Sequence, residues 1–247
     1  MKLPFGIDAG MGQRATLGLI VLPADETLEN EMRAILPRDG VALYHSRIAM
    51  PPEVTPETLA AMERALPAAA SMLPEIAFDV IGYGCTSGAT VIGPEGVARA
   101  VQSVRPGAAV VDPVSGTMAA ARALGVRRIG FVTPYVESVS AAMRQLLEAN
   151  GFEISGFGSF MEGDDRVVAR ITPDSVLAAI EDVATMATTD AVFVACTNLR
   201  VASIAEEAER RIGRPVISSN LALAWQMMRA AGLRSDTAPR IALFSRG

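Results

Sequence analysis

Short hydrophobic runs alternate with longer segments of helical spacing along most of the chain. Runs typical of strands buried on both faces occur at residues 17–22, 41–48, 78–82, 109–111, 128–132, 152–157, 191–195 and 216–217. Apolar residues at helical spacing cover residues 56–73, 94–104, 115–124, 136–150, 173–186, 201–212 and 221–231. We expect Thr55 to cap the first of these helices and Gly151 to end the fourth. The alternation predicts an α/β fold in which helices cover parallel sheets.

The order of strands and helices recurs on both sides of about residue 114. The phrase Gly107-Ala-Ala-Val-Val-Asp-Pro-Val-Ser115 precedes one predicted helix, and Gly213-Arg-Pro-Val-Ile-Ser-Ser219 precedes another. We interpret this recurrence as a duplication that gives two similar α/β lobes. Residues 14–114 together with 217–247 are predicted to form the first lobe, and residues 115–216 the second.

Length, charge and hydropathy narrow the class of protein. The chain has 247 residues, half of them hydrophobic, which is enough for two lobes of ordinary size. Its net charge is −5 and it has no long basic run, which argues against nucleic acid as a partner. No apolar stretch reaches the ~18 residues of a membrane span, and the N-terminus lacks the apolar core of a signal peptide. We therefore expect a cytoplasmic protein with reduced thiols and no membrane partner.

The only two cysteines occupy matching places in the two halves. Cys85 and Cys196 each follow an Asp and an apolar run, and each precedes a Thr. Both thiols are therefore predicted at the carboxyl ends of strands, where parallel sheets bind ligands, and we interpret them as a catalytic pair. Two buried core cysteines are the alternative, because free Cys is among the most buried residue types. A helix start after each cysteine is expected to lower the thiol pKa.

Other chemistries have less support in the sequence. The single histidine, His45, argues against a His-based triad, and we expect it to have a structural role or to support a neighbouring site residue. Two distant cysteines and one histidine do not form a spaced ligand set for a metal. No phosphate loop or dinucleotide fingerprint follows the first strand. We therefore expect neither a metal nor a cofactor. The small polar residues at the predicted strand ends are suited to bind a small acid.

Several phrases together resemble the aspartate/glutamate racemase superfamily, and within it the maleate cis–trans isomerase and arylmalonate decarboxylase branch. They are Gly18-Leu-Ile-Val-Leu, Gly84-Cys85-Thr-Ser-Gly88, Val132-Thr-Pro-Tyr135, Cys196-Thr-Asn198, and Ser218-Ser-Asn220 followed by Trp225. The resemblance implies two pseudo-symmetric lobes with the site in the cleft between them. Racemases of the superfamily use two cysteines as acid and base, whereas maleate isomerases add one cysteine to the alkene. Decarboxylases keep only the second cysteine, so the presence of both disfavours a decarboxylase here.

The resemblance also implies roles for individual residues. Cys85 would be the nucleophile or base, Cys196 the partner acid or base, and Tyr135 a donor to a carboxylate or developing enolate. The implied substrate-binding residues are Thr86, Ser87, Thr197, Asn198, Ser219 and Asp25. We therefore expect a cofactor-independent isomerase, similar to maleate cis–trans isomerase, that acts on a small carboxylate as a homo-oligomer of two or four copies. An amino-acid or hydantoin racemase is one alternative, and a decarboxylase or a non-catalytic small-acid binding protein is another.

The first loop departs from the isomerase pattern. Pro23-Ala-Asp25-Glu26-Thr27 stands where those isomerases typically carry Pro-Ser-x-Asn-Thr, and it looks more like a sub-branch of ectoine-utilisation proteins. An acidic side chain beside a dicarboxylate would be repulsive. Either the acids point away from the site, or the substrate carries a cationic group. We expect weak turnover of maleate and a preference for a substrate with an amino or amide group.

Overall fold

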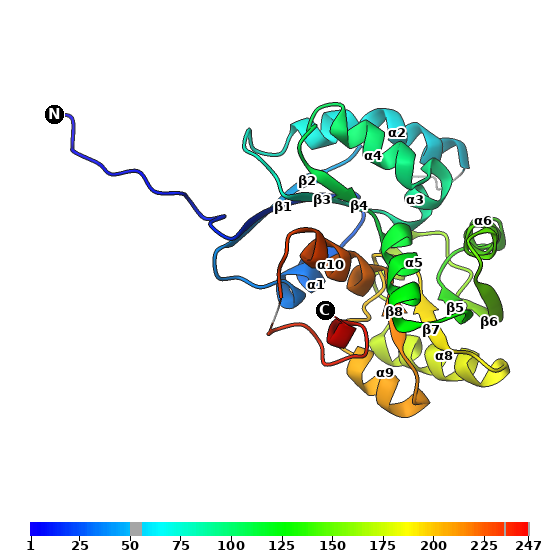
Figure 1. The fold of residues 1–247 in the computed structure, drawn as a ribbon. Coiled ribbons are helices and arrows are strands. Elements are labelled where there is room, and N and C mark those ends of the chain that lie inside the picture. The colour runs from blue at the N-terminus through cyan, green and yellow to red at the C-terminus, as the bar shows by residue number, and fades with distance from the viewer. Residues whose placement is uncertain (50–55, 235, 247) are drawn as a thin grey trace.

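The computed structural model describes residues 1–49, 56–234 and 236–246, and it contains two parallel sheets (Figure 1). The first sheet has the order β2-β1-β3-β4 and consists of β1 (Ala15–Val21), β2 (Val41–Arg47), β3 (Val80–Gly84) and β4 (Ala109–Val111). The second has the order β6-β5-β7-β8 and consists of β5 (Arg128–Thr133), β6 (Glu153–Ser159), β7 (Ala191–Val194) and β8 (Val216–Ser218). All neighbouring strands in both sheets are parallel. The predicted fold class is confirmed.

Helices cover both sheets. They are α1 (Leu28–Ile35), α2 (Pro56–Ser71), α3 (Thr86–Ile92), α4 (Pro94–Gln102), α5 (Pro113–Leu124), α6 (Glu137–Ala149), α7 (Asp165–Val168), α8 (Pro173–Met186), α9 (Ala205–Ile212) and α10 (Ser219–Ala230), with a 3-10 turn at Phe244–Arg246. Figure 1 shows α2 and α4 on one face of the first sheet and α1 and α10 on the other. In the second lobe, α8 packs on β5, β6 and β7.

The predicted strands and helices are present, and β4 and α8 have the predicted bounds. Gly151 follows α6 with φ +88°, in the left-handed region that suits the predicted helix end. Three helices have no predicted range, α1, α3 and α7, although α3 begins directly after Cys85, where a helix start is expected. The expected cap Thr55 lies outside the described residues.

In both lobes, an aspartate at the start of a central strand accepts a backbone hydrogen bond from the neighbouring strand. In the first lobe, Asp79 precedes β3 and accepts a hydrogen bond from the Thr16 N–H of β1 at 2.7 Å. In the second lobe, Asp190 precedes β7 and accepts from the Arg128 N–H of β5 at 2.8 Å. Because each aspartate anchors the strand that ends in a cysteine to its neighbour, the two cysteines leave their sheets at corresponding heights.

Helices α5 and α10 form the junction between the lobes. α10 packs along α5, and it also contacts β3 and β4 of the first sheet and β8 of the second. Asp112 caps α5 by accepting hydrogen bonds from the N–H groups of Val114 and Ser115. We propose that residues 219–247 belong with the first lobe, because α10 packs on β3 and β4. The predicted boundary at residue 217 is two residues early, because Ile217 and Ser218 pair with β7 in the second sheet.

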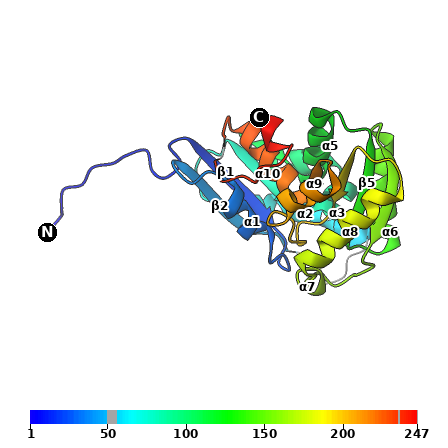
Figure 2. The same cartoon turned by 90° about the horizontal axis from the view of Figure 1, so that it is seen from below.

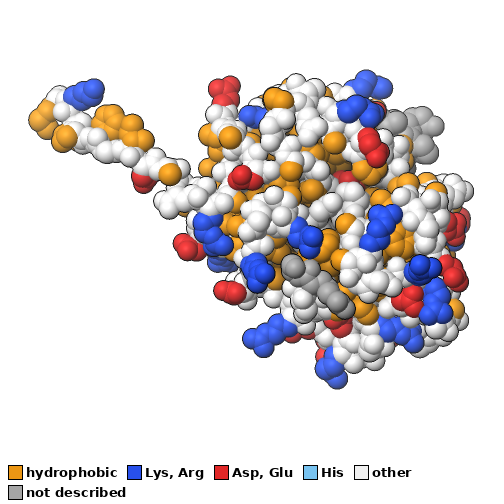
Figure 3. All heavy atoms as spheres, viewed as in Figure 1, with side chains coloured by type: hydrophobic (Ala, Val, Ile, Leu, Met, Phe, Trp, Pro, Cys, Tyr) orange, Lys and Arg blue, Asp and Glu red, His pale blue; other side chains and the backbone are white. Residues whose placement is uncertain are grey.

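The N-terminal segment and the surface differ from the packed interior. Residues 1–11 run away from the body of the protein, and they expose Leu3, Phe5 and Ile7 (Figures 1 and 2). On the face shown in Figure 3, acidic and basic side chains are interspersed over the body. In the described part of the chain, we find no helix of the length and apolar character that crossing a membrane requires.

Candidate active site

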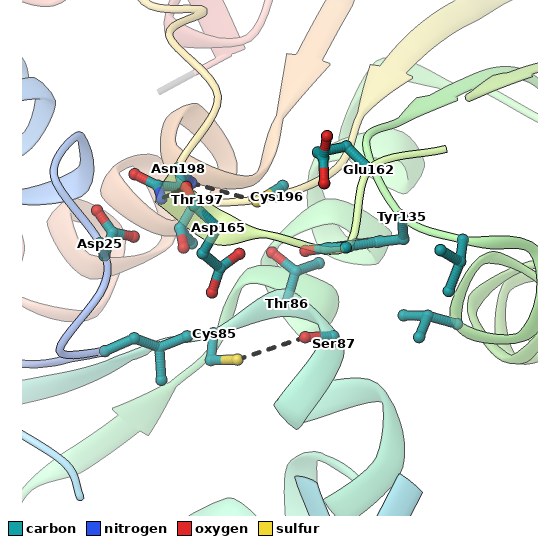
Figure 4. Close-up of a pocket in the computed structure, with 14 residues that line it drawn as sticks. Asp25, Cys85, Thr86, Ser87, Tyr135, Glu162, Asp165, Cys196, Thr197 and Asn198 are labelled. Atoms are coloured by element: carbon teal, nitrogen blue, oxygen red, sulfur yellow. Dashed lines mark hydrogen bonds between the residues drawn. The ribbon is translucent and has the colours of Figure 1, made fainter. Parts of the chain in front are cut away.

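A pocket lies at the carboxyl ends of β1, β3, β5, β6 and β7, between the two lobes (Figure 4). Its cavity has a volume of about 50 Å³. Its lining residues are Leu22, Asp25, Cys85, Thr86, Ser87, Tyr135, Val136, Val139, Glu162, Gly163, Asp165, Cys196, Thr197 and Asn198. The structure therefore gathers eight of the nine predicted site residues around one cavity, and Ser219 lies behind its wall.

Cys85 is held at the start of a helix. It is the N-cap of α3, and its Sγ accepts a hydrogen bond from the Gly88 N–H at 3.2 Å. The Ser87 hydroxyl lies 3.6 Å from the same sulfur. Burial raises the pKa of Cys85 to about 11, although Ser87 and Gly88 act in the opposite direction. The expected lowering of this pKa is therefore wrong, because loss of hydration outweighs two donors.

Cys196 follows its strand in a different way. Its φ is +96°, a conformation that residues with a side chain rarely adopt. The expected helix start directly after it is wrong, because residues 197–204 form a loop and α9 begins only at Ala205. The Asn198 N–H, at the start of this 197–204 loop, donates to Cys196 Sγ at 3.4 Å. Burial and the nearby Asp165 raise the pKa of Cys196, so the expected lowering is wrong here as well.

The two thiols lie on opposite walls of the pocket. Figure 4 shows Cys85 on one side and Cys196 on the other, with Asp165 and Thr86 between them. Both cysteines are free. They are buried from bulk solvent, yet they line one cavity. This arrangement favours a pair that faces one ligand over two separate core cysteines.

The two acids of the first loop take different positions. Glu26 lies at the surface and pairs with Arg170 at 2.8 Å. Asp25 lines the pocket, and its Oδ1 accepts hydrogen bonds from the N–H groups of Thr27 and Leu28. Its second oxygen, Oδ2, is buried and has no hydrogen-bond partner among the described residues. Burial raises the pKa of Asp25.

Two further acids, Glu162 and Asp165, line the pocket, and the sequence analysis missed both. Asp165 begins α7, in the polar segment after β6, and its side chain reaches the middle of the pocket (Figure 4). Burial and the charge of Asp25 raise the pKa of Asp165 to about 6. Both could have been predicted from the sequence, because they follow the strand predicted at 152–157 and ligands bind beyond strand ends.

Ser219 and Asn198 position the loops of the site. The Ser219 hydroxyl accepts a hydrogen bond from Thr86 Oγ1 at 2.8 Å and from the Cys196 N–H at 3.1 Å, and so joins the turns that carry the two cysteines. The amide of Asn198 accepts from the Glu26 N–H and donates to the carbonyl oxygens of Ala24 and Asp165. Through these bonds Asn198 holds the acidic loops together, and its substrate-binding role stays a prediction.

Tyr135 lies deep in the pocket. Burial raises its pKa well above the usual value, and the neighbouring thiols Cys196 and Cys85 raise it further. The phenol therefore keeps its proton and can donate a hydrogen bond to a ligand oxygen.

Sequence comparison relates nearly the whole chain to characterised enzymes. The profile of the family described as "Arylmalonate decarboxylase" matches residues 17–244. A maleate isomerase from Nocardia farcinica is 30% identical over 226 residues, which is 88% of this chain and 90% of that protein. A maleate isomerase from Alcaligenes faecalis is 24% identical over 233 residues, which is 89% of this chain and 92% of that protein.

Solved structures show the same fold. One is a cysteine-to-serine variant of the Nocardia farcinica maleate cis–trans isomerase with a covalently bound succinylcysteine intermediate. It superposes with a TM-score of 0.84 at 27% identity, over 94% of this chain and 99% of that one. Another is a liganded arylmalonate decarboxylase variant with one Gly→Cys and one Cys→Ser replacement. Its TM-score is 0.83 at 25% identity, over 94% of this chain and 100% of that one.

The shared fold, the extent of the profile match and the identity to the Nocardia enzyme all point to one group of proteins. The chain belongs to the arylmalonate decarboxylase and maleate isomerase family of the aspartate/glutamate racemase superfamily, a family of cofactor-independent isomerases and decarboxylases.

Proposed function

We propose that this protein is a cofactor-independent isomerase that acts on a small carboxylate through Cys85 and Cys196. The observation that carries the proposal is the position of two free thiols, one from each lobe, on opposite walls of one pocket. The succinylcysteine in the Nocardia farcinica structure supports covalent addition, because that variant lacks one cysteine and still carries the adduct on a cysteine.

The surroundings of the two sulfurs support different roles. Cys85 receives the Gly88 N–H and lies beside the Ser87 hydroxyl, and both donors stabilise a thiolate. Cys196 faces the carboxyl group of Asp165, which holds the proton on its thiol. We therefore assign Cys85 as the nucleophile and Cys196 as the proton donor.

The proposed reaction balances without a co-reactant. Cys85 reacts from its thiolate form, which is regenerated when the C–S bond breaks at the end. Its Sγ forms a bond to one alkene carbon, and the displaced electron pair moves toward the carboxylate of the other carbon. Cys196 protonates that carbon, and rotation occurs about the resulting single bond. Cys196 then takes a proton back as the C–S bond breaks and the double bond forms again. Tyr135 donates to the carboxylate oxygen where charge develops, a type of stabilisation worth about 3 kcal/mol per donor.

Thr86, Ser87 and Thr197 complete the proposed site. Each lines the pocket and carries a hydroxyl group. The Ser87 hydroxyl can turn from Cys85 Sγ to a carboxylate oxygen, whereas the Thr86 and Thr197 hydroxyls donate to Ser219 Oγ and the Gly84 carbonyl oxygen and bind a carboxylate only by exchanging those bonds. The acidic first loop supports a place for the chain near the ectoine-utilisation sub-branch rather than among typical maleate isomerases.

A racemase is the second candidate, and the acidic lining of the pocket favours it. Two thiols on opposite walls can remove a proton from one face of a carbon and return one to the other face. A decarboxylase receives less support, because both cysteines are present, and a non-catalytic binder gives no reason for two opposed thiols.

The proposal is tested by replacing each cysteine with serine. Cys85→Ser and Cys196→Ser should each abolish turnover, because a hydroxyl group is a far weaker nucleophile and acid at neutral pH. With an alkene substrate, intact-protein mass spectrometry of the Cys196→Ser variant should show an adduct that maps to Cys85.

Ser115→Ala serves as the control, because Ser115 lies in α5 outside the pocket lining. Full turnover by either cysteine variant would overturn the thiol mechanism. An adduct found only on Cys196 would reverse the two roles.

A further inference from the structure

We propose that Asp25 and Asp165 form a site for a cationic amino group, so that the substrate is a small carboxylate with an ammonium group rather than a dicarboxylate. This inference concerns the same pocket and rests on the function proposed above. It identifies the class of substrate on which the two thiols act.

The first observation is the state of Asp25. One carboxylate oxygen is occupied by the N–H groups of Thr27 and Leu28, at 2.9 and 2.8 Å. The other, Oδ2, is buried without a hydrogen-bond partner in the part of the chain that the structure describes, although the residue lines the pocket and is only 4% exposed. The Thr197 side chain lowers the pKa of this carboxyl group, but its hydroxyl donates to the Gly84 carbonyl oxygen at 3.4 Å. A buried carboxylate oxygen without a donor is costly. An ammonium group would supply the missing donor.

The second observation is the position of Asp165. It comes from the other lobe, lines the same pocket, and interacts electrostatically with Asp25. Two carboxylates near each other repel unless a proton or a cation lies between them. In Figure 4 the Asp165 carboxyl group extends between Asp25 and the space flanked by the two cysteines. A cation bound there would lie beside the reacting carbon.

The third observation is the lack of compensating charge. Among the described residues that line the pocket, the charged side chains are Asp25, Glu162 and Asp165, and none is Lys or Arg. A dicarboxylate would bring two more negative charges into this lining.

The nearby guanidinium groups are engaged elsewhere. Arg47 bonds to Glu29 and to the backbone oxygen of Leu22. Arg166 pairs with Asp164, and Arg170 pairs with Glu26 at the surface. The charge of the pocket is therefore left for the ligand to balance.

Binding of matched ligands to the full-length protein tests the proposal. Succinate and aspartate have the same carbon chain and differ by one ammonium group, while butyrate and 4-aminobutyrate differ in the same way with one carboxylate. Isothermal titration at pH 8 keeps Asp165 ionised, since its pKa is about 6. Each ammonium-bearing ligand should bind about tenfold more tightly than its partner, the effect of one charge-assisted contact.

Two isosteric variants locate the effect. Asp165→Asn should remove most of the preference for the ammonium-bearing ligands and improve succinate binding. Asp25→Asn keeps the acceptor Oδ1 and replaces Oδ2 by a donor, so it should also weaken the preference for ammonium-bearing ligands. This second variant tests the cation site if Asp165→Asn does not fold. Glu26→Gln is the matched control, because it removes a carboxylate of the same loop that pairs with Arg170 at the surface. It should leave the preference unchanged.

Several results would overturn the proposal. They are succinate binding as tightly as aspartate, failure of every ammonium-bearing ligand to bind, or an unchanged preference in both aspartate variants.

Protection of Cys85 and Cys196 from iodoacetamide separates this proposal from the thiol mechanism. If maleate protects both thiols and the amino compounds do not, the cation site is refuted while the thiol function stands. If the ammonium preference holds but the cysteine variants keep full turnover, only the thiol function is refuted.

Discussion

At the scale of single residues, burial controls the chemistry of the two thiols. Both sulfurs accept a backbone N–H, from Gly88 for Cys85 and from Asn198 for Cys196. Such donors favour a thiolate, yet the pKa of each cysteine is raised because burial removes hydration. A ligand that brings a positive charge into the pocket would therefore help to form the reactive thiolate.

The raised pKa of Cys85 predicts a specific dependence of reactivity on pH. With a pKa of about 11, Cys85 holds only a small thiolate fraction at neutral pH. In the Cys196→Ser variant, the rate of alkylation of Cys85 by iodoacetamide should rise about tenfold per pH unit from pH 7 and should not level off below pH 10. Peptide mass spectrometry gives the rate. The urea-unfolded variant is the control, and its alkylation rate should level off at a lower pH than that of the folded variant. A plateau in the rate of the folded variant near pH 8 would contradict the prediction.

Which residues meet in the pocket was partly predictable at this scale. The strand-end rule brought Cys85 and Cys196 together, because it depends only on local hydrophobic runs, and the family resemblance added Tyr135. The strand-end rule could not give the direction of the thiol pKa, which depends on how deeply the lobes bury each sulfur. Nor could it show that Glu26 turns outward while Asp25 turns inward, since adjacent residues in a loop follow no fixed alternation.

At the scale of elements, α1 of the first lobe holds the 197–204 loop of the second. Glu31 in α1 accepts hydrogen bonds from the N–H groups of Val201 and Ala202 through Oε1, and from Asn220 Nδ2 through Oε2. Asn220 Nδ2 also donates to the Thr197 carbonyl oxygen. One half-buried carboxylate therefore fixes the loop that follows Cys196.

This contact predicts that stability depends on the ionisation of Glu31. Burial raises the pKa of Glu31 from 4.5 to about 7. A raised folded-state pKa means that its stabilising contribution is fully present below pH 4.5 and is lost as the pH rises through 7. Between pH 5 and pH 8, the free energy of unfolding should fall by about 2 kcal/mol more in the unaltered protein than in Glu31→Gln.

Urea denaturation at several pH values measures this difference. Glu29→Gln serves as the control, since it removes a carboxylate from the same helix without touching the 197–204 loop. If the free energy of unfolding changed with pH in the same way in the unaltered protein and in Glu31→Gln, the pKa of Glu31 would not be raised in the folded protein, and the prediction would be wrong.

The elements themselves were largely predictable, and the exceptions have physical causes. Leu28, Met32 and Ile35 are the buried positions of α1 and have helical spacing, but the helix is only eight residues long and gives a weak periodic signal. α9 begins at Ala205 rather than Val201, after a loop that leaves Cys196 with a positive φ. A single strained residue of this kind is set by tertiary contacts and leaves no periodic trace in the sequence.

At the scale of the whole molecule, the site exists only because two lobes meet at a fixed distance. Ser219 at the start of α10 bonds to Thr86 of the first lobe and to the Cys196 N–H of the second. The position of α10 therefore sets the spacing of the cysteine turns. The internal recurrence in the sequence predicted two similar lobes, but their spacing depends on the packing of side chains between helices, which no local pattern encodes.

The close approach of α5 and α10 makes this spacing testable through Gly116. A Cβ atom at Gly116 would lie 3.0 Å from the carbonyl oxygen of Ala222 in α10, and a backbone atom cannot rotate away. Gly116→Val should therefore push the helices apart and lower the free energy of unfolding by about 1–3 kcal/mol, the usual cost of overpacking. Gly107→Val is the matched control, since a Cβ there meets nothing within 4 Å, and it should change stability by less than about 0.5 kcal/mol. Because α10 carries Ser219, Gly116→Val should also speed alkylation of both cysteines in the folded protein. Equal stability and equal thiol reactivity in the two variants would show that the close approach of α5 and α10 at Gly116 does not set the spacing of the lobes.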